Sequence, residues 1–188
     1  MSVNILLTGK PRTGKTTIIQ KFVQRCPASV GGFFTCEIRE HGVRVGFTIE
    51  AIRSWGNEDQ DGSGEKYHAV MAHINSPSPY RVGRYGVNIS SIEKVGITAL
   101  RDAIKRAKII IIDEIGRMEM YSTLFQKEVI NVLDCPLPVL GVIQMKRNPF
   151  LDSIRSRSDV TVIQVTSENR DALPERLFDI FSSSLFIG

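Results

Sequence analysis

Residues 9–17 constrain what this chain can fold into more than any other stretch of the sequence. The stretch fits the pattern G-x-x-x-x-G-K-[ST], in which a loop wraps around phosphate groups. Residues 3–8 read as a buried strand, and residues 16–25 carry apolar side chains at helical spacing. The pattern therefore stands between a strand and a helix, which is the context that it requires. The predicted nucleotide-binding residues of this loop are Gly9, Lys10, Pro11, Arg12, Thr13, Gly14, Lys15, Thr16 and Thr17.

The residue types of this loop suit the binding of a phosphate chain. Gly9 and Gly14 allow the tight backbone turns that point successive N–H groups inward. The helix that follows offers its unpaired N–H groups and its positive dipole end to the same anion. Lys15 can reach the β- and γ-phosphates of a nucleoside triphosphate, and the Thr16 hydroxyl can bind Mg²⁺. We therefore expect Mg²⁺ as a cofactor and Lys15 as a catalytic residue.

An acidic pair is predicted to lie opposite this loop. Four consecutive isoleucines at positions 109–112 read as a central parallel strand that is covered on both faces, and Asp113 and Glu114 follow them. Because ligands bind beyond the carboxyl ends of such strands, Asp113 is expected to face the loop and hold Mg²⁺ together with Thr16. Glu114 can orient a water molecule and take its proton, which would make it catalytic. The alternative is that Glu114 is a surface acid at a strand end.

The rest of the chain alternates strands with helices, apart from a strand-rich insert at residues 43–89. This order predicts an α/β fold whose sheet is mainly parallel and carries an antiparallel extension. Ser90 or Ser91 is expected to cap a helix, and Leu124 is expected to face the core. The other predicted strands are 33–39, 43–52, 66–74, 81–89 with a break, 139–143 and 161–165. The other predicted helices are 92–107, 122–133, 149–156 and 174–182, and a loop at 57–65 is flanked by Trp55 and Tyr67.

Length and composition bound the class of protein. The chain has 188 residues, enough for one domain with a full core, so we expect a single domain over residues 1–188. The net charge of +4 is mild and the basic residues are scattered, which argues against a nucleic-acid partner. No apolar run approaches the roughly 20 residues that span a bilayer, and three distant cysteines argue against a disulfide framework. We expect a cytoplasmic protein with no membrane partner, and the sequence names no protein partner.

The chain resembles the THEP-type nucleoside-triphosphatases, the family that includes the cancer-related nucleoside triphosphatase of vertebrates. Cys36 stands where this family usually has an acid, and Arg117 stands where it usually has a lysine. Besides the phosphate loop, the resemblance rests on segments spread over nearly the whole chain, which are 32–35, 44–47, 82–85, 112–119, 155–157 and 165–171.

This resemblance implies a three-layer P-loop NTPase fold of the additional-strand type. Residues 139–143 would then lie between the phosphate-loop strand and the strand that ends at Asp113. Gln144 would lie between Lys15 and Glu114 and sense the γ-phosphate, with a plain surface glutamine as the alternative. Members of the family look like slow hydrolases of a broad range of nucleoside triphosphates, which implies ATP, GTP and other triphosphates as substrates here.

An arginine is expected to stabilise the charge that triphosphate cleavage leaves. Arg117 is the first candidate, because it stands three residues beyond Glu114. For each candidate the alternative is a solvated surface arginine. The further candidates are Arg12, Arg147, Arg155 and Arg157.

Residues 166–171 follow the last strand and fit two roles. They can line the pocket of the base, or they can serve as a turn and a helix cap, since Ser, Thr, Asn and Asp are frequent in both. Two other functions also stay open. A nucleotide or nucleoside kinase would use an arginine lid between the last two strands and an acceptor pocket from the 43–89 insert. A nucleotide-gated binding module would use hydrolysis only as a timer.

Overall fold

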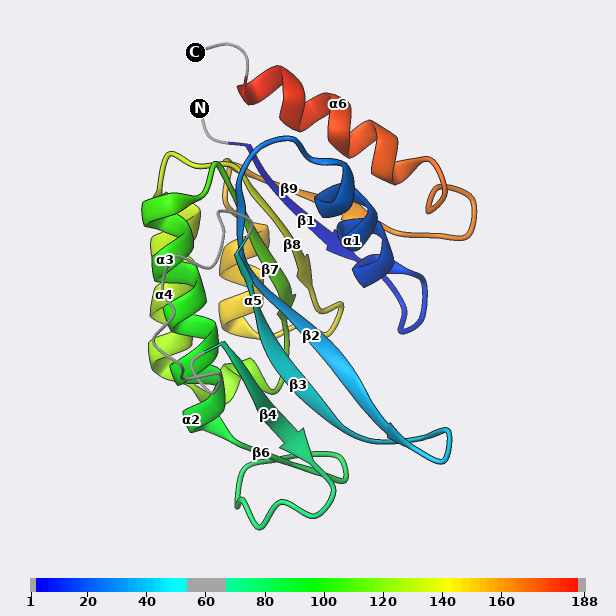
Figure 1. Cartoon of the computed structure of the whole chain (residues 1–188), viewed down its shortest axis with the longest axis vertical. Helices are drawn as coiled ribbons and strands as arrows, with labels where there is room; N and C mark the ends of the chain where they lie inside the picture. Colours follow the sequence, from blue (N-terminus) through cyan, green and yellow to red (C-terminus); the bar gives the residue numbers. More distant parts are fainter. Residues whose placement is uncertain (1–2, 54–66, 186–188) are drawn as a thin grey trace.

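A computed structural model describes residues 3–53 and 67–185, and within them nine strands form a single sheet (Figure 1). The loop predicted at 57–65 and the neighbouring Trp55 lie outside these residues. Along the sheet the strand order is β5-β6-β4-β3-β2-β7-β8-β1-β9. The strands are β1 Asn4–Thr8, β2 Val30–Glu40, β3 Val43–Arg53, β4 His68–His73, β5 Arg81–Val82, β6 Tyr85–Val87, β7 Ile109–Ile115, β8 Val139–Ile143 and β9 Val160–Gln164.

Five of the nine strands pair in parallel, and the other four form an antiparallel extension. Strands β2, β7, β8, β1 and β9 pair in parallel, whereas β3, β4, β6 and β5 extend the sheet from β2 by antiparallel pairing. This confirms the α/β sheet with an antiparallel extension that the sequence predicts. Strand β8 lies between β1 and β7, as expected for the additional-strand type.

Helices cover both faces of the parallel part. Figure 1 shows α1 and α6 on one side of the sheet and α3 and α4 on the other. Ile109 and Ile111 of β7 belong to the core under α1 and α6, and Ile110 and Ile112 belong to the core under the other helices. The isoleucine run is therefore buried on both faces, which explains why it does not alternate with polar residues. The helical segments are α1 Lys15–Arg25, α2 Ile89–Ser91, a π-helical turn Ile92–Ile97, α3 Thr98–Arg106, a 3₁₀ turn Glu119–Tyr121, α4 Thr123–Asp134, α5 Pro149–Arg155 and α6 Leu173–Leu185.

Close contact between β2 and β7 depends on Gly32. The backbone of Gly32 has a φ of +122°, and a Cβ placed there would lie 2.0 Å from the carbonyl oxygen of Ile111. Only glycine accepts this conformation without strain. The β2–β3 hairpin, from which the antiparallel extension continues, is thereby packed directly against β7, the strand that carries Asp113.

Two local expectations differ from the structure. The helix after β6 begins at Ile89 and is capped by Asn88, whose side chain accepts a hydrogen bond from the Ser91 N–H at 3.2 Å, so the caps expected at Ser90 or Ser91 are wrong. Leu124 is 54% exposed, because the inward stripe of α4 begins one residue later at Phe125.

In the described ranges, no helix combines the length and apolar character needed to cross a membrane.

Candidate active site

The phosphate loop folds around the ammonium group of Lys15. Its Nζ donates hydrogen bonds to the carbonyl oxygens of Gly9, at 3.0 Å, and of Lys10, at 2.9 Å. Gly14 has a φ of +95° and stands at the N-terminus of α1, where its carbonyl oxygen accepts from the N–H of Ile18 at 2.9 Å. The lysine is therefore held across the concave side of the loop, next to the first N–H groups of the helix.

Asp113 and Glu114 lie at the carboxyl end of β7, as predicted. The Thr16 hydroxyl donates to Asp113 Oδ1 at 3.3 Å, which joins the start of α1 to the end of β7. The other carboxyl oxygen of Asp113, Oδ2, is buried and has no hydrogen-bond partner in the described part of the chain. A buried oxygen of this kind calls for a cation, a proton or a water molecule.

Burial shifts the pKa values of Asp113, Glu114 and Lys15. Burial, together with the nearby Glu114, raises the pKa of Asp113 to about 7, against the opposing effects of Thr16 and Lys15. Burial also raises the pKa of Glu114, and the charge of Lys15 opposes that rise. The pKa of Lys15 is lowered by burial, while Glu114 and Asp113 act to raise it. Each group is thus poised by its environment, as is common at functional sites.

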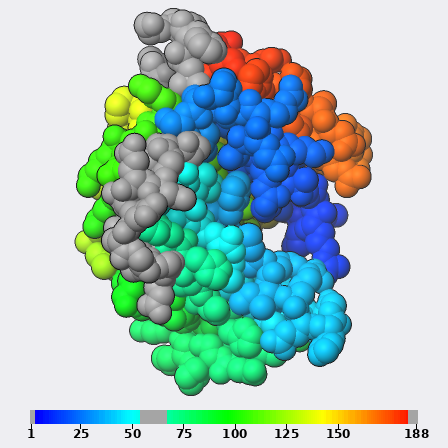
Figure 2. Space-filling model, in the orientation of Figure 1, coloured from blue at the N-terminus to red at the C-terminus, as the bar shows by residue number. Residues whose placement is uncertain are grey.

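Two cavities meet at Lys15 and Glu114. We name them the Thr16 cavity, with a volume of about 510 Å³, and the Glu119 cavity, with a volume of about 520 Å³. Figure 2 shows the surface hollowed between the blue phosphate-loop segment and the light-blue β2–β3 hairpin. The residues that line both cavities are Pro11, Lys15, Thr35, Arg44, Phe47 and Glu114.

Glu119 is a site residue that the sequence interpretation missed. Its side chain is 3% exposed, lines the cavity named after it, and accepts a hydrogen bond from the Gly116 N–H at 3.1 Å. Burial and the charge of Glu114 raise its pKa to about 8. A Cβ at Gly116 would lie 2.9 Å from Glu114 Oε1 and 3.1 Å from Glu119 Oε2, so both carboxyl groups occupy the space that this glycine leaves open.

The structure separates the five candidate arginines. Arg117 is exposed and lines the Glu119 cavity, and in the described ranges its guanidinium makes no hydrogen bond or ion pair. Arg12 lines the Thr16 cavity. Arg147 and Arg155 both pair with Asp152, at 3.2 and 2.8 Å.

Arg157 lies away from the phosphate loop, so it cannot play the predicted role at the phosphates. It pairs with Asp134 and Asp159, each at 2.7 Å. Asp159 also accepts a hydrogen bond from Asn4, which begins β1, whereas the phosphate loop follows the other end of that strand. Arg157 therefore lies near the amino ends of the parallel strands, away from the phosphate loop at their carboxyl ends, and its place among the candidates for charge stabilisation is wrong.

Gln144 lies where the additional-strand arrangement places it. Its side chain lines the Glu119 cavity together with Lys15 and Glu114. Its Oε1 is buried and has no hydrogen-bond partner in the described part of the chain. Arg155 donates to the carbonyl oxygen of Gln144, which fixes the backbone at this position.

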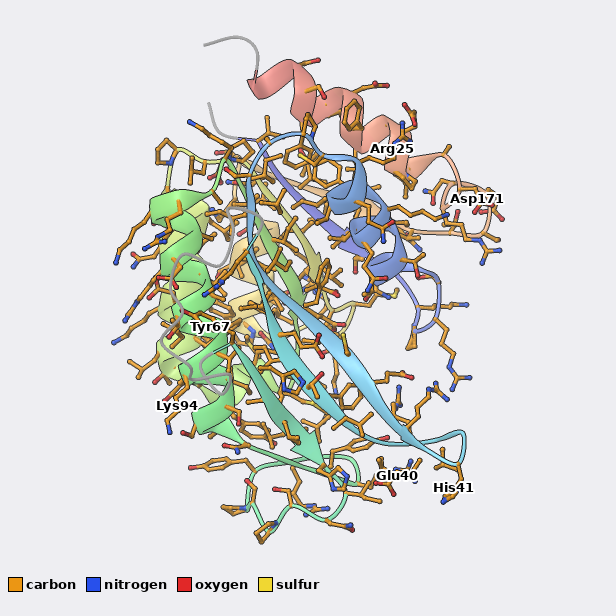
Figure 3. The ribbon with its side chains drawn as sticks, in the orientation of Figure 1. Arg25, Glu40, His41, Tyr67, Lys94 and Asp171 are labelled. Carbon is orange, nitrogen blue, oxygen red and sulfur yellow. The ribbon has the colours of Figure 1, made fainter. Side chains whose placement is uncertain are left out.

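Residues 166–171 show features of both roles that the sequence allows. Asn169 closes a turn, because its side chain accepts from the Thr166 N–H and donates to the Gln164 carbonyl oxygen, both at 2.9 Å. Arg170 and Asp171 line a third cavity of about 230 Å³ next to the first turns of α1. Figure 3 shows Asp171 in the loop before α6, on the side of the molecule where α1 lies. The residues of α1 and its cap in that cavity are Gly14, Thr17, Ile18 and Lys21.

The fold and this site define an α/β protein of the phosphate-loop class with an additional strand between β1 and β7. A family model described as NTPase matches residues 4–178. The chain belongs to this NTPase family.

Named relatives agree with this assignment. The nucleoside-triphosphatase THEP1 of Thermotoga sp. strain RQ2 is 36% identical over 178 residues, which cover 95% of each chain. The crystal structure of THEP1 from the hyperthermophile Aquifex aeolicus matches with a TM-score of 0.80 and 31% identity, over 95% of this chain and 99% of that chain. The solution structure of a human cancer-related nucleoside triphosphatase matches with a TM-score of 0.76 and 31% identity, over 97% of this chain and 99% of that chain.

Proposed function

We propose that this protein hydrolyses nucleoside triphosphates, ATP and GTP among them, to the diphosphate and inorganic phosphate in a Mg²⁺-dependent reaction. The observation that carries the proposal is the hydrogen bond of 3.3 Å between the Thr16 hydroxyl and Asp113, which brings the acidic strand end to the phosphate loop. Glu114 lines the same cavity as Lys15 and Thr16. The relatives described above are named nucleoside-triphosphatases, which supports the same reaction.

Thr16 and Asp113 are the residues that fit Mg²⁺. Both offer oxygen ligands, which this hard cation prefers, and Asp113 Oδ2 is a buried oxygen with no hydrogen-bond partner in the described part of the chain. Two protein oxygens suit an ion that takes its remaining ligands from phosphate and water. When bound, the ion neutralises charge that develops on the phosphate oxygens.

The protein's own groups then divide the work. Lys15 and the N–H groups of the loop bind the phosphate oxygens. Glu114 orients a water molecule, whose oxygen forms a bond to the γ-phosphorus while the bond from that phosphorus to the β-bridging oxygen breaks. The proton of the water passes to the Glu114 carboxylate, and the diphosphate leaves with the bridging oxygen. Gln144, which lines the Glu119 cavity beside Glu114, is placed to contact the terminal phosphate.

We propose that the base of the nucleotide binds between α1 and residues 166–171. Thr17, Lys21, Arg170 and Asp171 line the cavity there, and their polar groups can contact bases of different kinds. A site of this composition supports a broad base range, in line with ATP and GTP as substrates.

A second candidate function is phosphoryl transfer to a bound acceptor. The Glu119 cavity favours it, because its walls include Phe47, Met71, Val82 and Tyr85 from the strand-rich insert. A pocket with an apolar wall beside the Glu114 carboxylate can hold an acceptor hydroxyl in place of water.

A product assay separates the two functions. The pure protein is incubated with each of the four common triphosphates and Mg²⁺, with and without a panel of nucleosides and nucleoside monophosphates. Hydrolysis predicts release of inorganic phosphate at a rate that the acceptors leave unchanged, and loss of that release when Mg²⁺ is chelated. Transfer of phosphate to an acceptor much faster than to water would replace the hydrolase proposal with the kinase. Neither product from any triphosphate would contradict both.

A further inference from the structure

Arg44 connects the antiparallel extension to the phosphate site. It lies at the start of β3 and lines both the Thr16 cavity and the Glu119 cavity, each of which also contains Lys15 and Glu114. The sequence interpretation placed this residue in a family segment but gave it no role. Its position raises the question of what a second fixed positive charge does beside Lys15.

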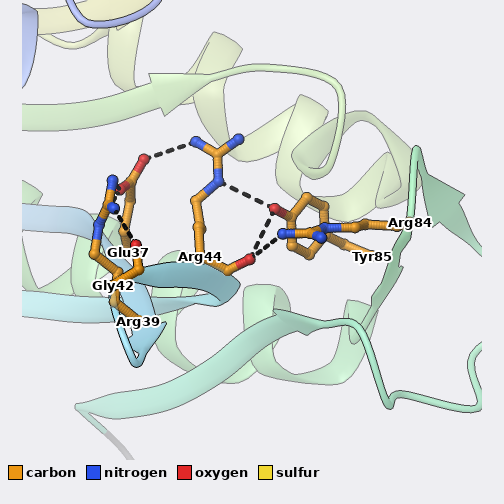
Figure 4. Close-up of polar contacts among 6 residues, drawn as sticks. All are labelled: Glu37, Arg39, Gly42, Arg44, Arg84 and Tyr85. Atoms are coloured by element: carbon orange, nitrogen blue, oxygen red, sulfur yellow. Dashed lines mark hydrogen bonds and ion pairs between the residues drawn. The ribbon is translucent and has the colours of Figure 1, made fainter.

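The guanidinium of Arg44 is held at two of its three nitrogens (Figure 4). Its Nε donates to the Tyr85 hydroxyl at 3.1 Å, and its Nη1 donates to Glu37 Oε1 at 2.7 Å. Its carbon also stacks 5.1 Å from the ring centre of Phe47 and 5.7 Å from that of Tyr85. A long side chain that would otherwise sample many rotamers is therefore pre-ordered.

The backbone of Arg44 is fixed as well. Its carbonyl oxygen accepts hydrogen bonds from the Arg84 guanidinium and from the Tyr85 hydroxyl, the latter at 3.4 Å. The small β5–β6 hairpin thus grips both the main chain and the side chain of Arg44. Glu37 comes from β2 and Tyr85 from β6, so residues of three strands, β2, β3 and β6, meet at one guanidinium group.

The charge of Arg44 is only partly compensated. Glu37 also pairs with Arg39 at 2.5 Å, so one carboxylate serves two guanidinium groups and the cluster keeps a net positive charge. In the described part of the chain, Arg44 Nη2 donates to no protein atom. Rigid donors with spare capacity next to a phosphate-binding loop suit an anionic oxygen.

We propose that Arg44 is a catalytic arginine supplied within the same chain, whose Nη2 contacts an oxygen of the terminal phosphate of the bound triphosphate. This inference rests on the proposed function, since it needs a triphosphate on the phosphate loop. Glu37 and Tyr85 are positioning residues, because they hold the guanidinium and do not themselves touch the phosphate. The antiparallel extension then has a purpose at the site, which is to carry and orient this charge.

The test compares Arg44→Gln with Arg39→Gln. Arg39 shares Glu37 with Arg44, but its other hydrogen bond goes to the Gly42 carbonyl oxygen and it lines neither cavity. Turnover of ATP with Mg²⁺ is expected to fall about a hundredfold or more in Arg44→Gln and less than about threefold in Arg39→Gln. Binding is measured with a non-hydrolysable ATP analogue and with ADP.

The binding measurements separate a phosphate contact from a structural effect. Contact with the terminal phosphate predicts weaker binding of the ATP analogue by Arg44→Gln and unchanged binding of ADP, because ADP lacks that phosphate. Arg44→Lys keeps the charge but cannot hold both Glu37 and Tyr85 in the same geometry. We therefore expect it, too, to bind the ATP analogue more weakly than wild type and to bind ADP with unchanged affinity. It also serves as the test variant if Arg44→Gln fails to fold.

Two outcomes would overturn the inference. One is an Arg44 variant that hydrolyses ATP like Arg39→Gln, and the other is an equal loss of affinity for ADP and the ATP analogue. Failure of the proposed function looks different, because wild-type protein would then release no phosphate at all. Even in that case the comparison of ADP with the ATP analogue still reports whether Arg44 contacts the third phosphate.

Discussion

At the scale of a residue, the buried carboxyl group of Glu119 has a raised pKa and therefore keeps its proton at pH values where an exposed glutamate has lost it. It is buried beside Glu114, and burial with that neighbouring charge raises its pKa to about 8 from an ordinary value of 4.5. Between these two pH values the folded state keeps a proton that the unfolded state has lost. The contribution to stability is therefore fully present below about pH 4.5 and is lost as the pH rises towards 8.

Glu119→Gln should flatten this dependence. The amide keeps the size of the side chain and an oxygen that can accept from the Gly116 N–H, but it does not ionise. From pH 5 to pH 8, wild type should lose at least ~1 kcal/mol more of its free energy of unfolding than the variant does. Urea denaturation at several pH values measures the difference. Parallel curves for the two proteins would show that Glu119 titrates normally.

The phosphate loop, Asp113 and Glu114 could be placed from the sequence because consecutive residues dictate their chemistry. Glu119 and Arg44 could not be placed in this way. Glu119 reaches the site through a 3₁₀ turn after β7. Arg44 reaches it through the pairing of β3 with β2 and through the hydrogen bond of its side chain to Tyr85 of β6. Both stand in segments that carry the family resemblance, and that was the available signal.

At the scale of an element, the β2–β7 pairing limits what the chain tolerates. Gly32→Ala would place a methyl group 2.0 Å from the Ile111 carbonyl oxygen at a φ of +122°, so one strand must move away from the other. We expect a loss of at least ~2–3 kcal/mol in the free energy of unfolding, by urea denaturation.

Gly42→Ala is the matched control for this prediction. Gly42 also has a positive φ, of +79°, but a Cβ there would meet no atom within 4 Å. Its substitution should cost only ~1 kcal/mol, from backbone strain alone. Equal losses for the two variants would show that close approach of the strands does not set the requirement at Gly32.

Strand and helix types could be predicted well, and their ends less well. The isoleucine run of β7 and the five residues of β8 have no competing interpretation, because both faces are buried. The start of the helix after β6 was misplaced because Asn88, Ser90 and Ser91 are all good caps, and only the three-dimensional path of β6 selects Asn88. Leu124 was wrongly assigned to the core because neighbouring residues on a helix point in different directions, so the apolar face that includes Phe125 leaves Leu124 exposed to solvent.

At the scale of the whole molecule, the question is whether Arg117 acts in the site of its own chain or in the site of a second chain. It lines the Glu119 cavity of its own chain together with Lys15 and Glu114. We therefore expect Arg117→Ala to reduce turnover at least about tenfold, and specific activity to be independent of protein concentration.

A mixing experiment checks this expectation. Arg117→Ala mixed with Lys15→Ala should recover nothing beyond the sum of the two preparations, because each chain lacks part of its own site. Recovery of activity on mixing, with loss on dilution, would show instead that the arginine acts across an interface between two chains. An Arg117→Ala protein with full activity would show that it is a surface residue.

The most direct test of the whole account is one paired measurement on Glu114→Gln. The substitution keeps the size of the side chain and removes the group proposed to take the proton of water, while Thr16 and Asp113 remain to hold Mg²⁺. Titration with a fluorescent triphosphate should show binding at least as tight as in wild type, while phosphate release falls by about two to four orders of magnitude. Normal phosphate release from the variant, or loss of binding and turnover together, would contradict the account.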